Sequence, residues 1–180
     1  YISHIHPDHY DPIFLKKLFD KWGEKPVLIP DFKSNYLYLR SQFDGIKTTP
    51  TNKETYGDTT IEIVPNITGS ISDIDSALFV NDGKHRVLNL NDCAWHDDHV
   101  ALLQSLTKSQ DQPIDLLALG YTGAGPYPQT YFDLETEIEI LETNAMKNKT
   151  EFFERYKKYC SAFPSKYHLP FAGQYILGGK

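Results

Sequence analysis

The stretch Ser3-His4-Ile5-His6-Pro7-Asp8-His9 holds three imidazoles and one carboxylate within six positions. Zinc and iron bind imidazole nitrogen, and a carboxylate oxygen can complete such a ligand set. On an extended backbone, His4 and His6 point to the same side of the chain. Pro7 favours a turn that brings Asp8 and His9 over the same point. An ordinary surface turn has no need for these side chains so close together, so the stretch predicts a metal site formed by His4, His6, Asp8 and His9.

The residues on either side of this stretch predict a strand before it and a helix after it. Tyr1-Ile2-Ser3 is interpreted as the end of a strand. Asp11 is a suitable N-cap and Pro12 suits the first helical position. Apolar residues at helical spacing continue to Trp22, and Gly23 ends the pattern. The candidate ligands are therefore expected on a strand-to-helix turn.

The rest of the chain alternates between strand and helix patterns. Strands are predicted over 26–30, 61–64, 77–80, 87–90, 114–119 and 171–177. Helices are predicted over 36–43, after an N-cap at Asp97 or Asp98, and from Asn148 onward. Asn81-Asp82-Gly83 predicts a hairpin, and Asn148 with Glu151 resembles a capping box. Residues 134–147 are left open between helix and loop. This alternation predicts an α/β domain with a mixed sheet.

Composition narrows the class of partner. The chain has 180 residues with a net charge of −6, and its basic residues are scattered, which argues against a nucleic-acid partner. No apolar run approaches the ~20 residues of a membrane span, and no signal peptide is visible. Cys93 and Cys160 form no metal or disulfide pattern, as is typical of a reducing, cytoplasmic location.

The ends of the sequence predict a piece of a longer polypeptide. The chain begins without Met directly before the metal motif, and it stops after an apolar run at Gly178-Gly179-Lys180. Residues 1–180 are therefore interpreted as a single domain within a longer chain.

His4-x-His6-x-Asp8-His9 resembles the HxHxDH signature of the metallo-β-lactamase fold. The resemblance implies an αββα sandwich of mixed sheets with the site along one edge, here lacking N-terminal strands and the C-terminal end. It also implies that His4 and His6 serve one metal, that Asp8 and His9 serve a second, and that a later Asp bridges the two. Asp92, directly after the strand at 87–90, is the best match to that bridging position.

Two further family ligands are less well matched. The family has another His before the strand pair that ends at the bridging Asp, but residues 66–76 contain no His. Asp73 or Asp75 could supply oxygen instead, or the position is empty. His168 is the candidate for the family's final His, with an ordinary loop as the alternative.

A narrower resemblance rests on four short motifs, namely Ile74-Asp75-Ser76-Ala77, Leu90-Asn91-Asp92-Cys93, 123–128 and Pro170-Phe171-Ala172-Gly173. They are similar to the CMP-N-acetylneuraminate hydroxylase-like branch and to the lactonase branch that acts on ascorbate 6-phosphate. In the hydroxylase branch the fold accompanies a Rieske iron–sulfur module. No Cys-x-His pair of that type occurs here, so such a module would lie outside this sequence.

The loop from Gly120 to Pro128 follows a buried strand, where loops line sites in open α/β sheets. It lacks the spacing of a nucleotide motif, yet Gly123, Gly125 and Tyr127 are candidates for binding a substrate.

The leading hypothesis is a metal-dependent hydrolase acting on an ester, lactone or phosphoester of a small polar metabolite, with Asp8 as catalytic residue. It would use one or two divalent metal ions; zinc is the leading candidate, and iron and manganese are the alternatives. The second hypothesis is an iron-dependent oxygenase-like protein acting on a nucleotide sugar or a similar metabolite. The third is a degenerate domain that only binds metal.

Overall fold

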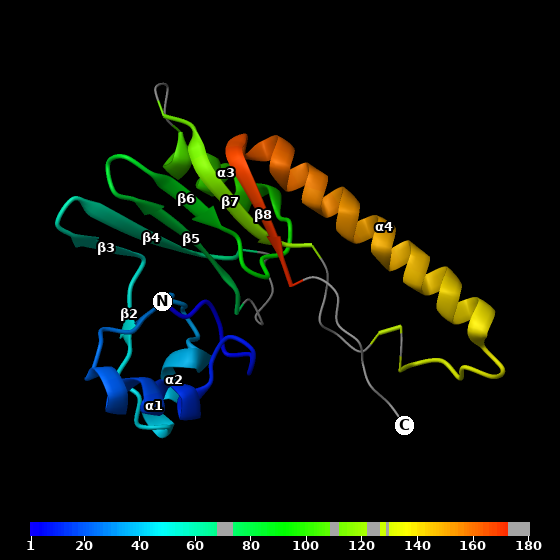
Figure 1. Ribbon diagram of the computed structural model, residues 1–180, viewed down its shortest axis with the longest axis horizontal. Helices are drawn as coiled ribbons and strands as arrows, with labels where there is room; N and C mark the ends of the chain where they lie inside the picture. Colours follow the sequence, from blue (N-terminus) through cyan, green and yellow to red (C-terminus); the bar gives the residue numbers. More distant parts are fainter. Residues whose placement is uncertain (68–73, 109–111, 122–126, 129, 173–180) are drawn as a thin grey trace.

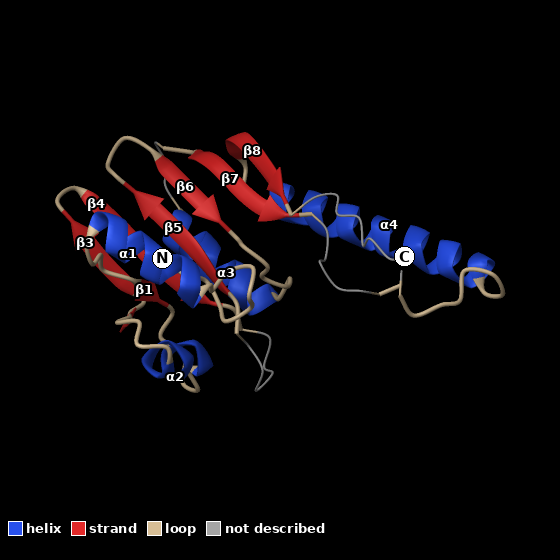
Figure 2. Ribbon diagram, turned by 60° about the horizontal axis from the view of Figure 1, so that its bottom comes forward, coloured by secondary structure: helices blue, strands red, loops and turns tan. Residues whose placement is uncertain are grey.

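The computed structural model describes residues 1–67, 74–108, 112–121, 127–128 and 130–172. A six-stranded mixed sheet forms the centre of the molecule, in the order β3-β4-β5-β6-β7-β8 (Figure 1). Its strands are β3 (Lys53–Tyr56), β4 (Thr59–Pro65), β5 (Ser76–Asn81), β6 (Arg86–Asn89), β7 (Ile114–Gly120) and β8 (Ser165–Phe171). The strands from β3 to β6 are antiparallel, whereas β6, β7 and β8 run parallel to one another (Figure 2). The α/β class with a mixed sheet is confirmed.

The predicted hairpin between β5 and β6 is confirmed, and its turn chemistry explains it. Gly83 adopts a positive φ of 83°, which favours glycine. The carboxylate of Asp82 accepts hydrogen bonds from the backbone N–H groups of Lys84 and His85 at 2.9 and 2.6 Å. The turn fixes the register, so that Val80 lies opposite Val87.

One face of the sheet is covered by helices. Helix α3 (Asp97–Thr107) and the C-terminal end of α4 (Ile138–Ala162) pack on it, and the rest of α4 runs away from the sheet (Figure 1). The shared core is apolar and comprises Val64, Ala77, Phe79, Leu88, Leu90, Cys93, Val100, Leu103, Ile114, Leu117, Leu119, Tyr159 and Phe163. This core supports the end of β6, from which the chain enters the loop with Asp92.

Leu117, at the centre of β7, should contribute strongly to stability. It is fully buried, so Leu117→Ala should lower the free energy of unfolding by about 2–5 kcal/mol. Leu116 is on the opposite face and only half-buried, so Leu116→Ala should cost about 1 kcal/mol. Urea titration followed by far-UV circular dichroism measures both. Equal losses would contradict the assignment of the core to the α3 side.

The other face of the sheet is also apolar. One row of residues in register crosses five strands on this face, and it consists of Ile61, Val80, Val87, Leu116 and Tyr167. The first four are half-buried, and Tyr167 is exposed. A sheet that is apolar on both faces is the type that packs between two layers, as the predicted sandwich requires.

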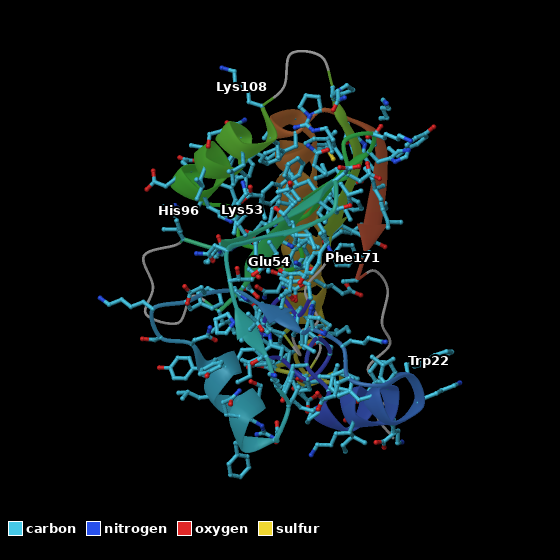
Figure 3. All side chains as sticks on the ribbon, turned by 90° about the vertical axis from the view of Figure 1, so that its left-hand side faces the viewer. Trp22, Lys53, Glu54, His96, Lys108 and Phe171 are labelled. Carbon is cyan, nitrogen blue, oxygen red and sulfur yellow. The ribbon has the colours of Figure 1, made fainter. Side chains whose placement is uncertain are left out.

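A smaller unit lies beside the sheet and carries the N-terminal motif. It contains α1 (Pro12–Trp22), α2 (Tyr36–Phe43) and a parallel pair, β1 (Leu28–Ile29) and β2 (Thr49–Pro50). Its own core is formed by Ile2, Tyr10, Val27, Ile29 and Leu37. Trp22 lies at the end of α1 with most of its ring exposed (Figure 3).

The helix start predicted at Asp11 and Pro12 is confirmed. The Asp11 carboxylate accepts hydrogen bonds from the N–H groups of Ile13 and Phe14 at 2.9 and 3.0 Å. At α3, however, the predicted cap was wrong, because His96 is the N-cap and Asp97 is the first helical residue. The Asp97 carboxylate instead accepts a hydrogen bond from Trp95 Nε1 at 2.7 Å.

Three other predictions needed correction. Helix α4 begins at Ile138, ten residues before Asn148, so the apparent capping box lies inside the helix. The last strand is 165–171 and not 171–177, and residues 173–177 lie outside the described part. Tyr1-Ile2-Ser3 is not a strand, although the Ile2 N–H donates a hydrogen bond to the Leu28 carbonyl at 3.0 Å.

Among the described residues, no helix is long and apolar enough to cross a membrane.

Candidate metal centre

The motif forms a tight turn that directs its side chains inward. The backbone N–H groups of His9 and Tyr10 both donate to the His6 carbonyl, at 2.9 and 2.8 Å. Tyr10 is buried in the small N-terminal core and anchors the end of the turn. The closed turn brings His9 back over His4, and their ring centroids lie 4.0 Å apart.

The imidazoles converge on the carboxylate that follows β6. One oxygen of Asp92, Oδ2, lies 3.4 Å from His9 Nε2 and 3.8 Å from His4 Nε2. His6 Nδ1 lies 2.9 Å from His4 Nε2, and Asp8 Oδ2 lies 3.6 Å from His9 Nε2. The four motif residues and Asp92 are thus brought to one place, although 82 residues of sequence lie between His9 and Asp92.

A buried polar network holds the Asp92 loop against the N-terminal segment. Ser76, at the start of β5, is fully buried, and its hydroxyl donates to the Ser3 carbonyl at 2.9 Å. Asn91 donates from Nδ2 to the Ser76 carbonyl at 2.8 Å and to the Tyr1 hydroxyl at 3.1 Å. Asn91 adopts a positive φ of 47°, a conformation that Asn tolerates better than most residues. The network therefore fixes the residues adjacent to His4 and to Asp92.

Asp75 is a further carboxylate at the site. It precedes Ser76, and its Oδ1 lies 3.3 Å from His4 Nδ1. It is one of the two residues that could replace the missing family His, if that position is not empty; the other, Asp73, lies outside the described residues. Asp75 faces the Nδ1 side of the His4 ring, whereas Asp92 faces the Nε2 side.

Burial and the neighbouring charges move the pKa values of this group in different directions. Burial, together with the nearby His9 ring, lowers the pKa of His4 from 6.5 to about 4. The hydrogen bond to Asp92 raises the pKa of His9, and the same bond lowers the pKa of Asp92. His4 is therefore neutral at pH 7 and able to offer a nitrogen lone pair, and Asp92 is ionised.

The lowered pKa of His4 should make the metal-free protein sensitive to acid. Unfolding restores the ordinary pKa of 6.5, so the unfolded chain binds a proton that folded His4 binds only near pH 4. The contribution of His4 to the free energy of unfolding should therefore fall as the pH drops from about 6.5 to 4, by about 1–3 kcal/mol in total. His9 acts in the opposite sense, because a raised pKa contributes stability at low pH.

Chelator-treated protein unfolded by urea at pH 7, 5.5 and 4.5 measures this effect. His4→Asn removes the titrating ring, so the stability of the variant should fall less between pH 7 and 4.5 than that of the wild type. Parallel curves for the two proteins would contradict the assignment to His4.

The structure places the other predicted site residues elsewhere. His168 lies exposed on β8, in register with Leu117, and is not part of the His4–His9–Asp92 group. Tyr127 donates its hydroxyl to Asn144 Oδ1 at 2.7 Å, which ties it to α4. Gly123 and Gly125 lie outside the described residues. Ser3, which the motif analysis did not single out, bonds two of the candidate ligands, and its position directly before the first His was the available signal.

The residues present suit a divalent metal ion. One ligand atom each from His4, His9 and Asp92 all lie within 4.8 Å of one another. Two imidazoles and one carboxylate are a donor set that zinc and iron both accept. The carboxylate also supplies negative charge, which offsets part of the charge of a cation.

No family model matches the sequence, but solved structures resemble it. CmlA, a diiron β-hydroxylase from Streptomyces venezuelae, aligns with a TM-score of 0.59 at 12% identity over 94% of this chain and 34% of its own. A variant of CmlA gives 0.61 at 14% identity over 95% of this chain and 35% of its own. The short form of human tRNase Z gives 0.52 at 12% identity over 94% of this chain and 70% of its own. All are metallo-β-lactamase-fold proteins.

The chain has the metallo-β-lactamase fold. Its curated relatives include proteins of Mycolicibacterium smegmatis and Mycobacterium tuberculosis named as Rieske 2Fe-2S iron-sulfur proteins, each 29% identical over 96% of this chain. The chain spans 33% of the length of either relative.

Proposed function

We propose that this chain is the metal-binding domain of an iron-dependent oxidoreductase that receives electrons from a Rieske centre in the same longer polypeptide. The observation that carries the proposal is the ligand group of two imidazoles and one carboxylate, His4, His9 and Asp92. That set, with open positions, is typical of non-haem iron sites that use O₂. The Rieske name of relatives aligned over 96% of the chain supports iron over zinc, and this reverses the order favoured by the motif alone.

The ligand residues have distinct roles in this proposal. His4 is fully buried and His9 partly exposed, so His4 would hold the ion from the interior of the protein and His9 from the solvent side. Asp92 faces both rings and supplies the charge. His6 adds a further nitrogen 2.9 Å from His4 Nε2. Iron held there would supply one-electron and O₂ chemistry to the domain.

Asp8 is the proposed acid–base residue. Its side chain is 60% exposed, and its Oδ2 lies 3.6 Å from His9 Nε2. A carboxylate at the boundary between the ligands and solvent can hold a proton at Oδ2 and exchange it with water or with a substrate hydroxyl. The proposed substrate is a small polar metabolite, with a nucleotide sugar as the class that the hydroxylase-like motifs favour.

A metal-dependent hydrolase is the second candidate. The exposed carboxylate of Asp8 beside the ligand group favours it, because the same group could accept a proton from an attacking water. The candidate substrates are esters, lactones and phosphoesters of polar metabolites. Zinc, rather than iron, would be the metal expected for this chemistry.

Metal analysis of the untreated protein separates the two candidates. We expect the protein, purified as the full-length polypeptide without chelator, to hold iron at the motif in addition to any iron in a Rieske cluster. Plasma mass spectrometry of wild type and of a Asp92→Ala variant gives the difference, about one to two iron atoms per chain. Loss of zinc instead of iron in the variant, together with lactone or phosphoester hydrolysis by the wild type, would favour the hydrolase.

A further inference from the structure

The hydroxyl of Ser3 lies between two of the candidate ligands. Ser3 Oγ is 3.0 Å from His4 Nδ1 and 2.9 Å from His9 Nδ1. The other nitrogen of each ring, Nε2, faces the same oxygen of Asp92. Both rings thus point one nitrogen at the Ser3 hydroxyl and the other at the proposed metal position.

Metal binding at Nε2 would require one tautomer of each ring, and the Ser3 hydroxyl lies where it can accept a hydrogen bond from that tautomer. A neutral imidazole carries one proton, so a ring that offers the Nε2 lone pair to a metal must carry its proton on Nδ1. A serine hydroxyl has two acceptor lone pairs. Ser3 Oγ can therefore accept an Nδ1–H bond from His4 and another from His9 at the same time.

Ser3 is itself held in place. Its side chain is buried, with 3% of the residue exposed, and its carbonyl accepts the hydrogen bond from Ser76 Oγ at 2.9 Å. Because the Ser76 carbonyl also accepts a hydrogen bond from Asn91 Nδ2, the backbone of Ser3 is tied to the loop that carries Asp92. A fixed acceptor of this kind orients both rings before any metal arrives.

We infer that Ser3 is the positioning residue of this metal site, whose single hydroxyl holds His4 and His9 in the Nδ1–H tautomer with both Nε2 atoms directed at the ion. The inference rests on metal binding at this site, which the proposed function includes, but not on the identity of the metal or on the reaction. Partners of metal-ligating histidines commonly change metal affinity 10–100-fold when they are removed.

The isosteric pair Ser3→Thr and Ser3→Val tests the role of the hydroxyl. The two variants differ only in a hydroxyl against a methyl, so both disturb packing equally. Zinc serves as the probe, and its affinity is measured for chelator-treated protein by competition with a chromophoric chelator. We expect Ser3→Thr to bind zinc within about threefold of wild type, and Ser3→Val to bind about 10–100-fold more weakly.

Two further variants serve as controls for unfolding and for a general loss of stability. Ser3→Ala removes the hydroxyl without adding bulk, and should weaken zinc binding as Ser3→Val does. Ser41→Ala is the matched control, because Ser41 is also fully buried and hydrogen-bonded, to Thr48 and to the Tyr38 carbonyl, but lies in α2. It should leave zinc affinity unchanged. Circular dichroism of each metal-free variant checks that the fold is retained.

Nuclear magnetic resonance of the zinc-loaded protein gives a readout that a purely structural role would not change. Ser3 is the described partner of His9 Nδ1, whereas His4 Nδ1 also has Asp75 at 3.3 Å. In Ser3→Val the His9 Nδ1 proton should therefore exchange with water faster than in Ser3→Thr, and the His4 proton should change less.

The outcomes separate this inference from the proposed function. Equal zinc affinity and equal proton exchange in Ser3→Thr and Ser3→Val would overturn the role of Ser3 while leaving the proposed function standing. The expected differences, in a protein that shows no iron-dependent redox activity, would support Ser3 and overturn the proposed function. Wild-type protein that binds neither zinc nor iron would overturn both.

Discussion

Replacing His6 and Asp92 together by alanine should strip the protein of its bound metal. Asp92 faces the Nε2 atoms of both His4 and His9, and His6 adds a nitrogen 2.9 Å from His4 Nε2. Sites with four ligands bind zinc with about 10–16 kcal/mol, or about 3 kcal/mol per ligand. The loss of two ligands should therefore weaken binding by about 6 kcal/mol, close to 10⁴-fold. Plasma mass spectrometry of the purified variant measures the loss.

A matched control uses the same residue types outside the site. His85 and Asp82 form an exposed pair at the β5–β6 turn, with 3.2 Å between Nδ1 and Oδ2. Substituting both by alanine changes the charge as the test variant does but should leave the metal content at the wild-type level. Unchanged metal in the His6→Ala, Asp92→Ala variant would mean that the site lies elsewhere in the molecule.

The candidate site was largely predictable because its residues are adjacent in sequence. Four of them lie within six positions, and Asp92 was found through the family resemblance, which places a metal-binding Asp directly after a strand. Asp75 was one of two carboxylates that could replace the missing family His, and Ser3 was marked only by its position directly before His4, since one serine has many ordinary roles. The proximity of Asp75 to His4 goes with the hydrogen bond that the neighbouring Ser76 makes to Ser3 across 73 residues of sequence, and only the folded chain shows such a contact.

The elements that prediction missed or placed wrongly have polar or exposed residues where a core pattern would be expected. β3 and β8 are edge strands, and such strands are shielded from further pairing by charges or proline. β3 is Lys-Glu-Thr-Tyr, and β8 contains Pro170 and His168, so neither shows a buried alternation. Helix α4 is exposed along its first half, so no apolar periodicity marks its start at Ile138.

Replacing Tyr159 by alanine should release α4 from the sheet. Tyr159 is the buried residue of this 25-residue helix, and 1% of it is exposed. Its ring contacts Trp95 at a centroid distance of 4.9 Å and Phe163 at 6.5 Å. Removing a buried aromatic ring costs about 3–5 kcal/mol through lost contacts and the cavity left behind. Because the rest of α4 is at least partly exposed, few other contacts can compensate.

The hydroxyl of Tyr159 also makes a hydrogen bond to the loop that carries Asp92, and a second variant tests this bond alone. It donates to the Cys93 carbonyl at 3.2 Å, directly after Asp92. Tyr159→Phe keeps the ring and loses only this bond, so it should cost about 1 kcal/mol. Phe153→Ala, at a site 44% exposed, should cost less than about 1 kcal/mol. Urea unfolding ranks the three variants, and amide hydrogen exchange locates the loss. Rapid exchange confined to α4 in Tyr159→Ala would show that one side chain anchors the helix, whereas full protection of α4 in that variant would show that its anchoring contacts lie elsewhere.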